Sequence, residues 1–174
     1  MMVGHHASLP DTLFKKYYDD VGRRDQVANY KKRIEGADTL RAYIAEHSLC
    51  RVVVPQKWLL KLPQPPFREQ SFILAVERLD LLSKSETIAR YCNLDEDTLR
   101  ELCRCLRRFR GLDSSEHNVC LTRDGKVAFI DLEHWDHGGN RKYLKFLGPL
   151  MSRDTRKRAE SFLGRGQQQW QWRR

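Results

Sequence analysis

The sequence predicts an α+β fold in which a strand-rich first half is followed by a mainly helical second half. Residues 71–76 form a continuous apolar run, which is typical of a strand covered on both faces. Residues 51–54 are rich in valine and stop at Pro55, which also indicates a strand. With 174 residues, of which 40% are hydrophobic, the chain can bury one sizeable core or two small ones.

Two further elements are expected in the first half. Residues 12–15 predict a short strand that ends in Lys15. Residues 30–47 predict an amphipathic helix with Glu35 in its first turn, because apolar residues recur at three- and four-residue steps. These apolar positions are Ile34, Ala37, Leu40 and Ile44.

The second half carries helix signals from its beginning. Ser83 caps a first expected helix, and Asp95 caps a longer one over residues 96–110. Two shorter amphipathic helices are expected at residues 142–150 and 153–163. The apolar stripe of the longer helix is typical of core packing and consists of Leu99, Leu102, Cys103, Leu106 and Phe109.

Three stretches predict irregular structure. Residues 1–11 have no periodicity and are expected to be a loose lead-in. Residues 63–66 hold three prolines, which sustain neither a helix nor a strand ladder. Residues 164–174 mix Gly, Gln, Trp and Arg and are expected to be a disordered tail.

The net charge of +9 belongs almost entirely to the C-terminal part of the chain. From residue 141 onward, ten Lys or Arg residues stand against two acidic ones, which gives +8. The first 140 residues carry 22 basic and 21 acidic residues, which gives +1. We therefore expect the tail to attach to an anionic surface or nucleic acid through charge and stacking.

Several classes of protein are disfavoured by what the sequence lacks. No apolar run approaches the roughly 18 residues of a membrane span, so no transmembrane segment is expected. The first residues lack the apolar centre of a signal peptide. Five cysteines without CxxC spacing indicate reduced packing residues, and hence a cytoplasmic location.

A predicted hairpin brings three polar side chains together. Asp124-Gly125 separates two short apolar runs, and this dipeptide tolerates the positive φ of a tight turn. Asn118 opens the first strand and Asp131 closes the second, so the two lie side by side. Asp113 precedes them on the incoming loop, and we expect all three to converge.

The pattern Asp-x4-Asn, a hairpin and an apolar strand ending in Ile-Asp-Leu resembles the catalytic core of the protein-kinase-like fold. The order of elements over roughly 120 residues resembles it too: strands, a hinge, two helices and the catalytic loop. The resemblance implies a truncated two-lobed fold. Its small lobe and hinge would span residues 1–80, its reduced large lobe 81–163, and its tail 164–174.

The resemblance also implies ATP and Mg²⁺ as cofactors. We expect a protein as the phosphate acceptor, and the sequence leaves a small molecule and a lipid open as alternatives. Asp113 would orient the accepting hydroxyl, while Asn118 and Asp131 would bind Mg²⁺ on the nucleotide phosphates.

The same resemblance assigns residues in the small lobe. Lys15 would contact the α- and β-phosphates, with Lys16 as its rival, and Glu35 would form an ion pair with that lysine. Residues 77–79 would be the hinge, where the backbone of Glu77 and Leu79 binds adenine.

The chain departs from the family pattern at several points. Gly111-Leu112 stands where His-Arg or His-Gly is usual, and Glu133 replaces the Gly of the Phe-Gly that normally follows the second Asp. Only Gly4 represents a glycine-rich phosphate loop before Lys15. Because 41 residues follow Glu133, the chain resembles the compact kinase-like effectors that some bacterial pathogens deliver into the host cytoplasm.

Three functional hypotheses remain open on these residues. The first is an active Mg-ATP phosphotransferase, and the second is a pseudokinase or nucleotide-binding interaction module. The third is a metal-dependent nuclease of the ββα-metal type, although no histidine pair has the helical i, i+4 spacing of a metal motif. Its ligand set would come from His117, Asn118, Asp131, His134 and His137.

Overall fold

The computed structural model describes residues 2–16, 26–63, 72–115, 117–136, 144 and 146–164. In these ranges the chain has the predicted α+β character, with two sheets and four α-helices. None of the described helices is long and apolar enough to cross a membrane. The expected tail beyond Gly164 lies outside the described residues, as does most of the proline-rich stretch after residue 63.

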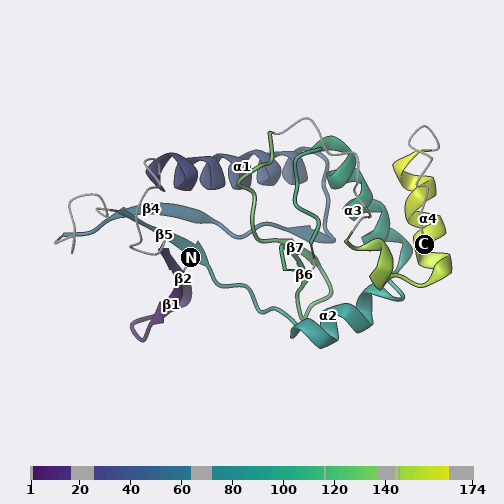
Figure 1. Ribbon diagram of the computed structural model, residues 1–174, viewed down its shortest axis with the longest axis horizontal. Coiled ribbons are helices and arrows are strands. Elements are labelled where there is room, and N and C mark those ends of the chain that lie inside the picture. The colour runs from purple at the N-terminus through teal and green to yellow at the C-terminus, as the bar shows by residue number, and fades with distance from the viewer. Residues whose placement is uncertain are drawn as a thin grey trace, which may run out of the picture.

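The first sheet is antiparallel, has the strand order β1-β2-β5-β4 and packs beneath the long helix α1 (Gln26–Glu46) (Figure 1). Leu74 and Val76 are buried on one face of the central strand β5, where Tyr30 of the helix packs on them. Its strands are β1 (Met2–His6), β2 (Leu9–Lys16), β4 (Lys57–Lys61) and β5 (Phe72–Glu77).

The prediction of a loose lead-in at residues 1–11 is wrong. Met2–His6 forms strand β1, which pairs with β2 in an antiparallel ladder. All five residues of β1 are exposed, so no alternation of apolar and polar residues marks the strand in the sequence. Backbone pairing with β2 makes it a strand, and only the fold supplies that partner.

The second sheet contains the predicted hairpin. Strands β6 (Val119–Leu121) and β7 (Val127–Phe129) pair antiparallel, and β3 (Val52–Val53) adds to β7 in parallel. Gly125 has φ +87° in the turn, which confirms the positive φ expected of Asp124-Gly125.

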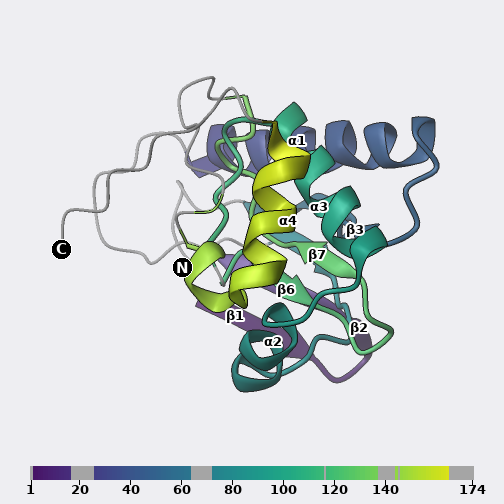
Figure 2. The ribbon, with the colours of Figure 1, turned by 90° about the vertical axis from the view of Figure 1, so that its right-hand side faces the viewer.

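Helices form the far end of the molecule from β4. In α2 (Lys84–Tyr91) the cap Ser83 forms a capping box, and Asp95 caps α3 (Glu96–Arg108), as predicted. The expected stripe of α3 is buried, and α4 (Arg153–Leu163) packs beside it (Figure 2). Of the helix expected at residues 142–150, the described part contains the short 3₁₀ turn η1 (Gly148–Leu150).

Helix α1 touches the segment that follows β7 at a glycine. A Cβ atom on Gly36 would lie 2.6 Å from the Leu132 carbonyl oxygen and 2.5 Å from Cδ1 of Trp135. Real Cβ atoms do not approach backbone so closely, so a larger residue would push the helix away. Gly36 therefore lets α1 rest directly on the residues after Asp131.

Candidate functional site

The loop after α3 holds Asp113 in a fixed geometry. One carboxylate oxygen of Asp113 accepts a hydrogen bond from the Ser115 amide at 3.0 Å. The other accepts from the side-chain amide nitrogen of Asn118 at 2.7 Å. Because Asn118 donates through its side-chain nitrogen here, its side-chain oxygen Oδ1 is the atom that could bind a cation.

Asp131 lies beside Asn118 because the hairpin pairing continues past β7. The Ile130 amide donates to the Asn118 carbonyl oxygen at 2.8 Å, so Asp131 follows directly after a residue paired with Asn118. The structure thus brings Asp113, Asn118 and Asp131 to one end of the hairpin, as the sequence predicts.

Asp131 is also bound from the first half of the chain, by Arg33 of α1. Nη1 of Arg33 lies 2.9 Å from Oδ2 of Asp131, and Nη2 bonds the Glu133 carboxylate. The Arg33 side chain is 6% exposed, against 23% and 21% for its two partners. Sequence reasoning missed Arg33, although it lies three residues after buried Tyr30 and four before buried Ala37, on the apolar stripe.

The predicted ion pair between Lys15 and Glu35 does not form. Glu35 is exposed, because the helix buries positions 33 and 37 and so turns position 35 outward. No ion pair joins Lys15 to Glu35 in the part of the chain that the structure describes. The charge that faces the sheet from this helix is therefore a cation, Arg33, and not the expected carboxylate.

Lys15 itself is buried on β2, while its rival Lys16 is half-buried. Burial lowers the pKa of Lys15, and the nearby Asp131 carboxylate partly offsets that effect by raising the pKa. The Asp131 carboxylate therefore lies close enough to act on Lys15, although 115 residues separate them in the sequence.

A second buried lysine, Lys57 on β4, lies in the same region and was not predicted. It is 4% exposed, and its Nζ donates to the Ile130 carbonyl oxygen at 2.9 Å. Burial lowers the pKa of Lys57 to about 7, and the positive charge of Lys15 adds to the effect. In the sequence, Lys57 stands out only as a single cation at the start of a largely apolar stretch, two residues after Pro55.

Lys57 should make the stability of the protein depend on pH. The unfolded chain keeps this lysine near its ordinary pKa of 10.5, so between about pH 7 and 10.5 the unfolded state binds more protons than the folded state. The free energy of unfolding should then rise with pH, by about 1.4 kcal/mol per unit for one proton. Between pH 7 and 9, in metal-free buffer, wild type should gain about 2 kcal/mol relative to Lys57→Met in urea unfolding.

The matched control for this measurement is Lys61→Met, because Lys61 is exposed on the same strand. Its profile should run parallel to that of wild type. If the free energy of unfolding depends on pH in the same way for wild type and Lys57→Met, the lowered pKa of Lys57 is contradicted.

The segment that follows β5 is held at its beginning by two backbone hydrogen bonds. The amides of Glu77 and Arg78 donate to the carbonyl oxygens of Gln56 and Asp11, both at 2.8 Å. The Leu79 amide makes no such bond within the described residues. Glu77 and Leu79 are the two residues expected to bind adenine through the backbone. Of these, Leu79 has the backbone amide that is available to donate to a ligand.

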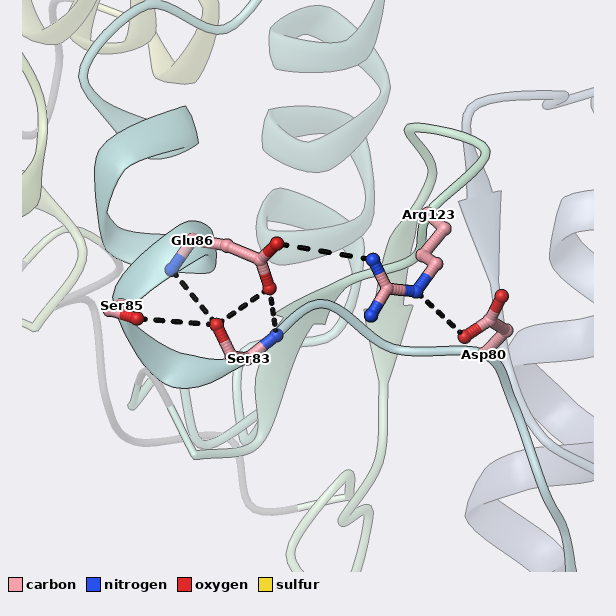
Figure 3. A network of polar contacts seen from close by, with 5 residues as sticks. All are labelled: Asp80, Ser83, Ser85, Glu86 and Arg123. Atoms are coloured by element: carbon pink, nitrogen blue, oxygen red, sulfur yellow. Dashed lines mark hydrogen bonds and ion pairs between the residues drawn. The ribbon is translucent and has the colours of Figure 1, made fainter.

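The hairpin tip holds this segment from the other side (Figure 3). The Arg123 amide donates to the Asp80 carbonyl oxygen at 2.9 Å, and its side chain reaches the carboxylates of Asp80 and Glu86. These pairs are exposed and add little stability, but they align the hairpin with the segment. Glu86 also accepts hydrogen bonds from Ser83, which lower the pKa of Glu86.

The end of the hairpin supplies few protein ligands for a metal ion, so a metal ion there would need further ligands from a bound substrate. No group of three or more His, Cys, Asp or Glu residues that could hold a metal is found among the described residues, and His137 lies outside them. Asn118 and Asp131 offer one amide oxygen and one carboxylate. Mg²⁺ is commonly held by one or two protein carboxylates plus substrate phosphates, so these two residues could supply only the protein's share of such a coordination shell.

The chain matches no protein-family model, and a comparison with curated proteins finds no significant match. The functional argument therefore depends on the site itself.

Proposed function

We propose that the protein is a Mg-ATP-dependent phosphotransferase of a minimal kinase-like type. The observation that carries this proposal joins two distant parts of the chain: Lys15 lies near Asp131, and Asp131 follows the backbone partner of Asn118, whose side chain binds Asp113. The order of elements supports it as well: a sheet with a buried lysine, a long helix, a linking segment, two helices, a loop and a hairpin.

In this proposal each residue has a distinct task. Lys15 neutralises charge on the nucleotide phosphates, and the Leu79 amide binds the adenine edge. Asn118 and Asp131 hold Mg²⁺, which supplies charge neutralisation at the transferred phosphoryl group. Asp113 accepts a hydrogen bond from the hydroxyl of the acceptor, which we take to be a protein, and so orients it for attack.

A nucleotide-binding module without transfer activity is the second candidate, and one contact favours it. Arg33 already bonds Asp131, and a guanidinium at that carboxylate opposes the approach of a metal cation. Glu133 shares the charge of Arg33 and so leaves part of the Asp131 charge for Mg²⁺. Transfer activity decides between the two candidates.

The experiment is a thermal shift measurement with Mg-ATP, followed by transfer of labelled phosphate. Mg-ATP should raise the melting temperature of wild type, because a ligand that binds only the folded state stabilises it by mass action. Lys15→Ala should reduce the shift, and Lys16→Ala, the matched control, should keep it. If millimolar Mg-ATP does not change the melting temperature of wild type, the nucleotide site is refuted.

A further inference from the structure

The two buried lysines lie on the same face of the first sheet. Lys15 pairs with Leu74 of β5, and Lys57 pairs with Val76 of β5 from the other side. Directly paired residues share a face, and Leu74 and Val76 are two residues apart on one strand. Lys15 and Lys57 therefore both belong to the face that α1 covers.

The charges at this face do not cancel among themselves. Three cations, Lys15, Lys57 and Arg33, lie near two carboxylates, those of Asp131 and Glu133. Arg33 forms ion pairs with both carboxylates, and neither lysine has a carboxylate within ion-pairing distance in the described structure. Asp38 of α1 is exposed, and of the two carboxylates that raise the pKa of Lys57 it has the smaller effect.

Buried ammonium groups without a counter-ion are costly, so this arrangement suits an anionic ligand. We propose that Lys57 is a second cation of the site that binds the phosphate groups of the nucleotide. The ammonium of Lys57 has three N–H donors and uses one on the Ile130 carbonyl oxygen, which leaves two for a phosphate oxygen. This inference deepens the proposed function and rests on it for the identity of the ligand.

A purely structural role for Lys57 is the competing explanation, because the bond to Ile130 also joins β4 to the hairpin end. Two substitutions separate the explanations. Lys57→Gln keeps a donor for the Ile130 carbonyl but removes the charge, and Lys57→Arg keeps the charge. Lys61→Met removes an exposed lysine from the same strand and is the matched control.

Calorimetry should measure the binding of Mg-ATP and of inorganic tripolyphosphate to each protein, with circular dichroism to verify folding. Loss of a charge-assisted hydrogen bond predicts that Lys57→Gln binds both probes about tenfold or more weakly, whereas Lys57→Arg and Lys61→Met stay near wild type. If Lys57→Gln is folded and binds both probes as wild type does, Lys57 is structural and the inference is overturned.

The use of two probes separates this inference from the proposed function. Wild type that binds tripolyphosphate through Lys57 but does not bind Mg-ATP supports the anion site and refutes the nucleotide function. Wild type that binds Mg-ATP without any dependence on Lys57 supports the nucleotide function and refutes the second cation. Binding of neither probe refutes both. A Lys57→Arg variant that is folded and binds as weakly as Lys57→Gln refutes the second cation and leaves the nucleotide function standing.

Discussion

Asp113→Ala should lower the rate of phosphate transfer by about 10²- to 10⁴-fold and leave stabilisation by Mg-ATP nearly unchanged. The reason is that Asp113 would act on the acceptor hydroxyl and not on the nucleotide. Its contacts in the structure, with Ser115 and Asn118, orient its carboxylate and add little to the core. Single-turnover transfer and thermal shift should be measured on the same preparation.

The Asp131→Asn variant should lose both phosphate transfer and stabilisation by Mg-ATP, because the neutral amide no longer attracts Mg²⁺ to the nucleotide phosphates. Asp97→Asn, an exposed aspartate of α3, is the matched control and should behave as wild type. If Asp131→Asn keeps the full thermal shift and the full rate, the assignment of the hairpin end as the metal site is wrong.

Arg33→Met should give the largest loss of stability among single substitutions at the site. Removal of one partner from a buried ion pair leaves an uncompensated charge, which costs about 3–5 kcal/mol when the pair is fully buried. Asp131 and Glu133 are each more than a fifth exposed, so water lowers the cost to about 2–3 kcal/mol. Urea unfolding near pH 7 measures it directly.

Two further variants test the origin of that loss. Lys32→Met replaces an exposed cation on the same helix and should change stability by less than about 0.5 kcal/mol. The double variant Arg33→Met with Glu133→Gln should be more stable than the two single effects predict when added, because it removes a charge together with its partner. Additive effects, or an Arg33→Met variant as stable as Lys32→Met, would contradict the ion pair.

Elements with a local signal could be predicted from the sequence. The hairpin follows from Asp124-Gly125, and the helix starts follow from Ser83 and Asp95, because the residues that determine these features are neighbours in the chain. The hairpin also predicted that Asn118 and Asp131 would lie together, since antiparallel pairing fixes the partner of each strand end.

Elements that depend on distant partners could not be predicted. Strand β1 has no buried side chain, so only its pairing with β2 identifies it. Arg33 and Lys57 are explained by contacts with Asp131 and Ile130, 98 and 73 residues further along. The assignment of Glu35 failed for a related reason: the order of charges along a helix does not show which one faces the sheet until the buried face is known.

The ion pair between Arg33 and Glu133 joins residues 100 positions apart in the sequence, so it can form only late in folding. The first sheet and α1 contain Lys15, Lys57 and Arg33, and the carboxylates that form ion pairs with Arg33 come from the end of the hairpin. During synthesis the N-terminal half therefore emerges before the negative charges that its buried face requires. That half should stay loosely packed until the hairpin arrives, so the site closes as one of the last steps of folding and not as part of an early domain.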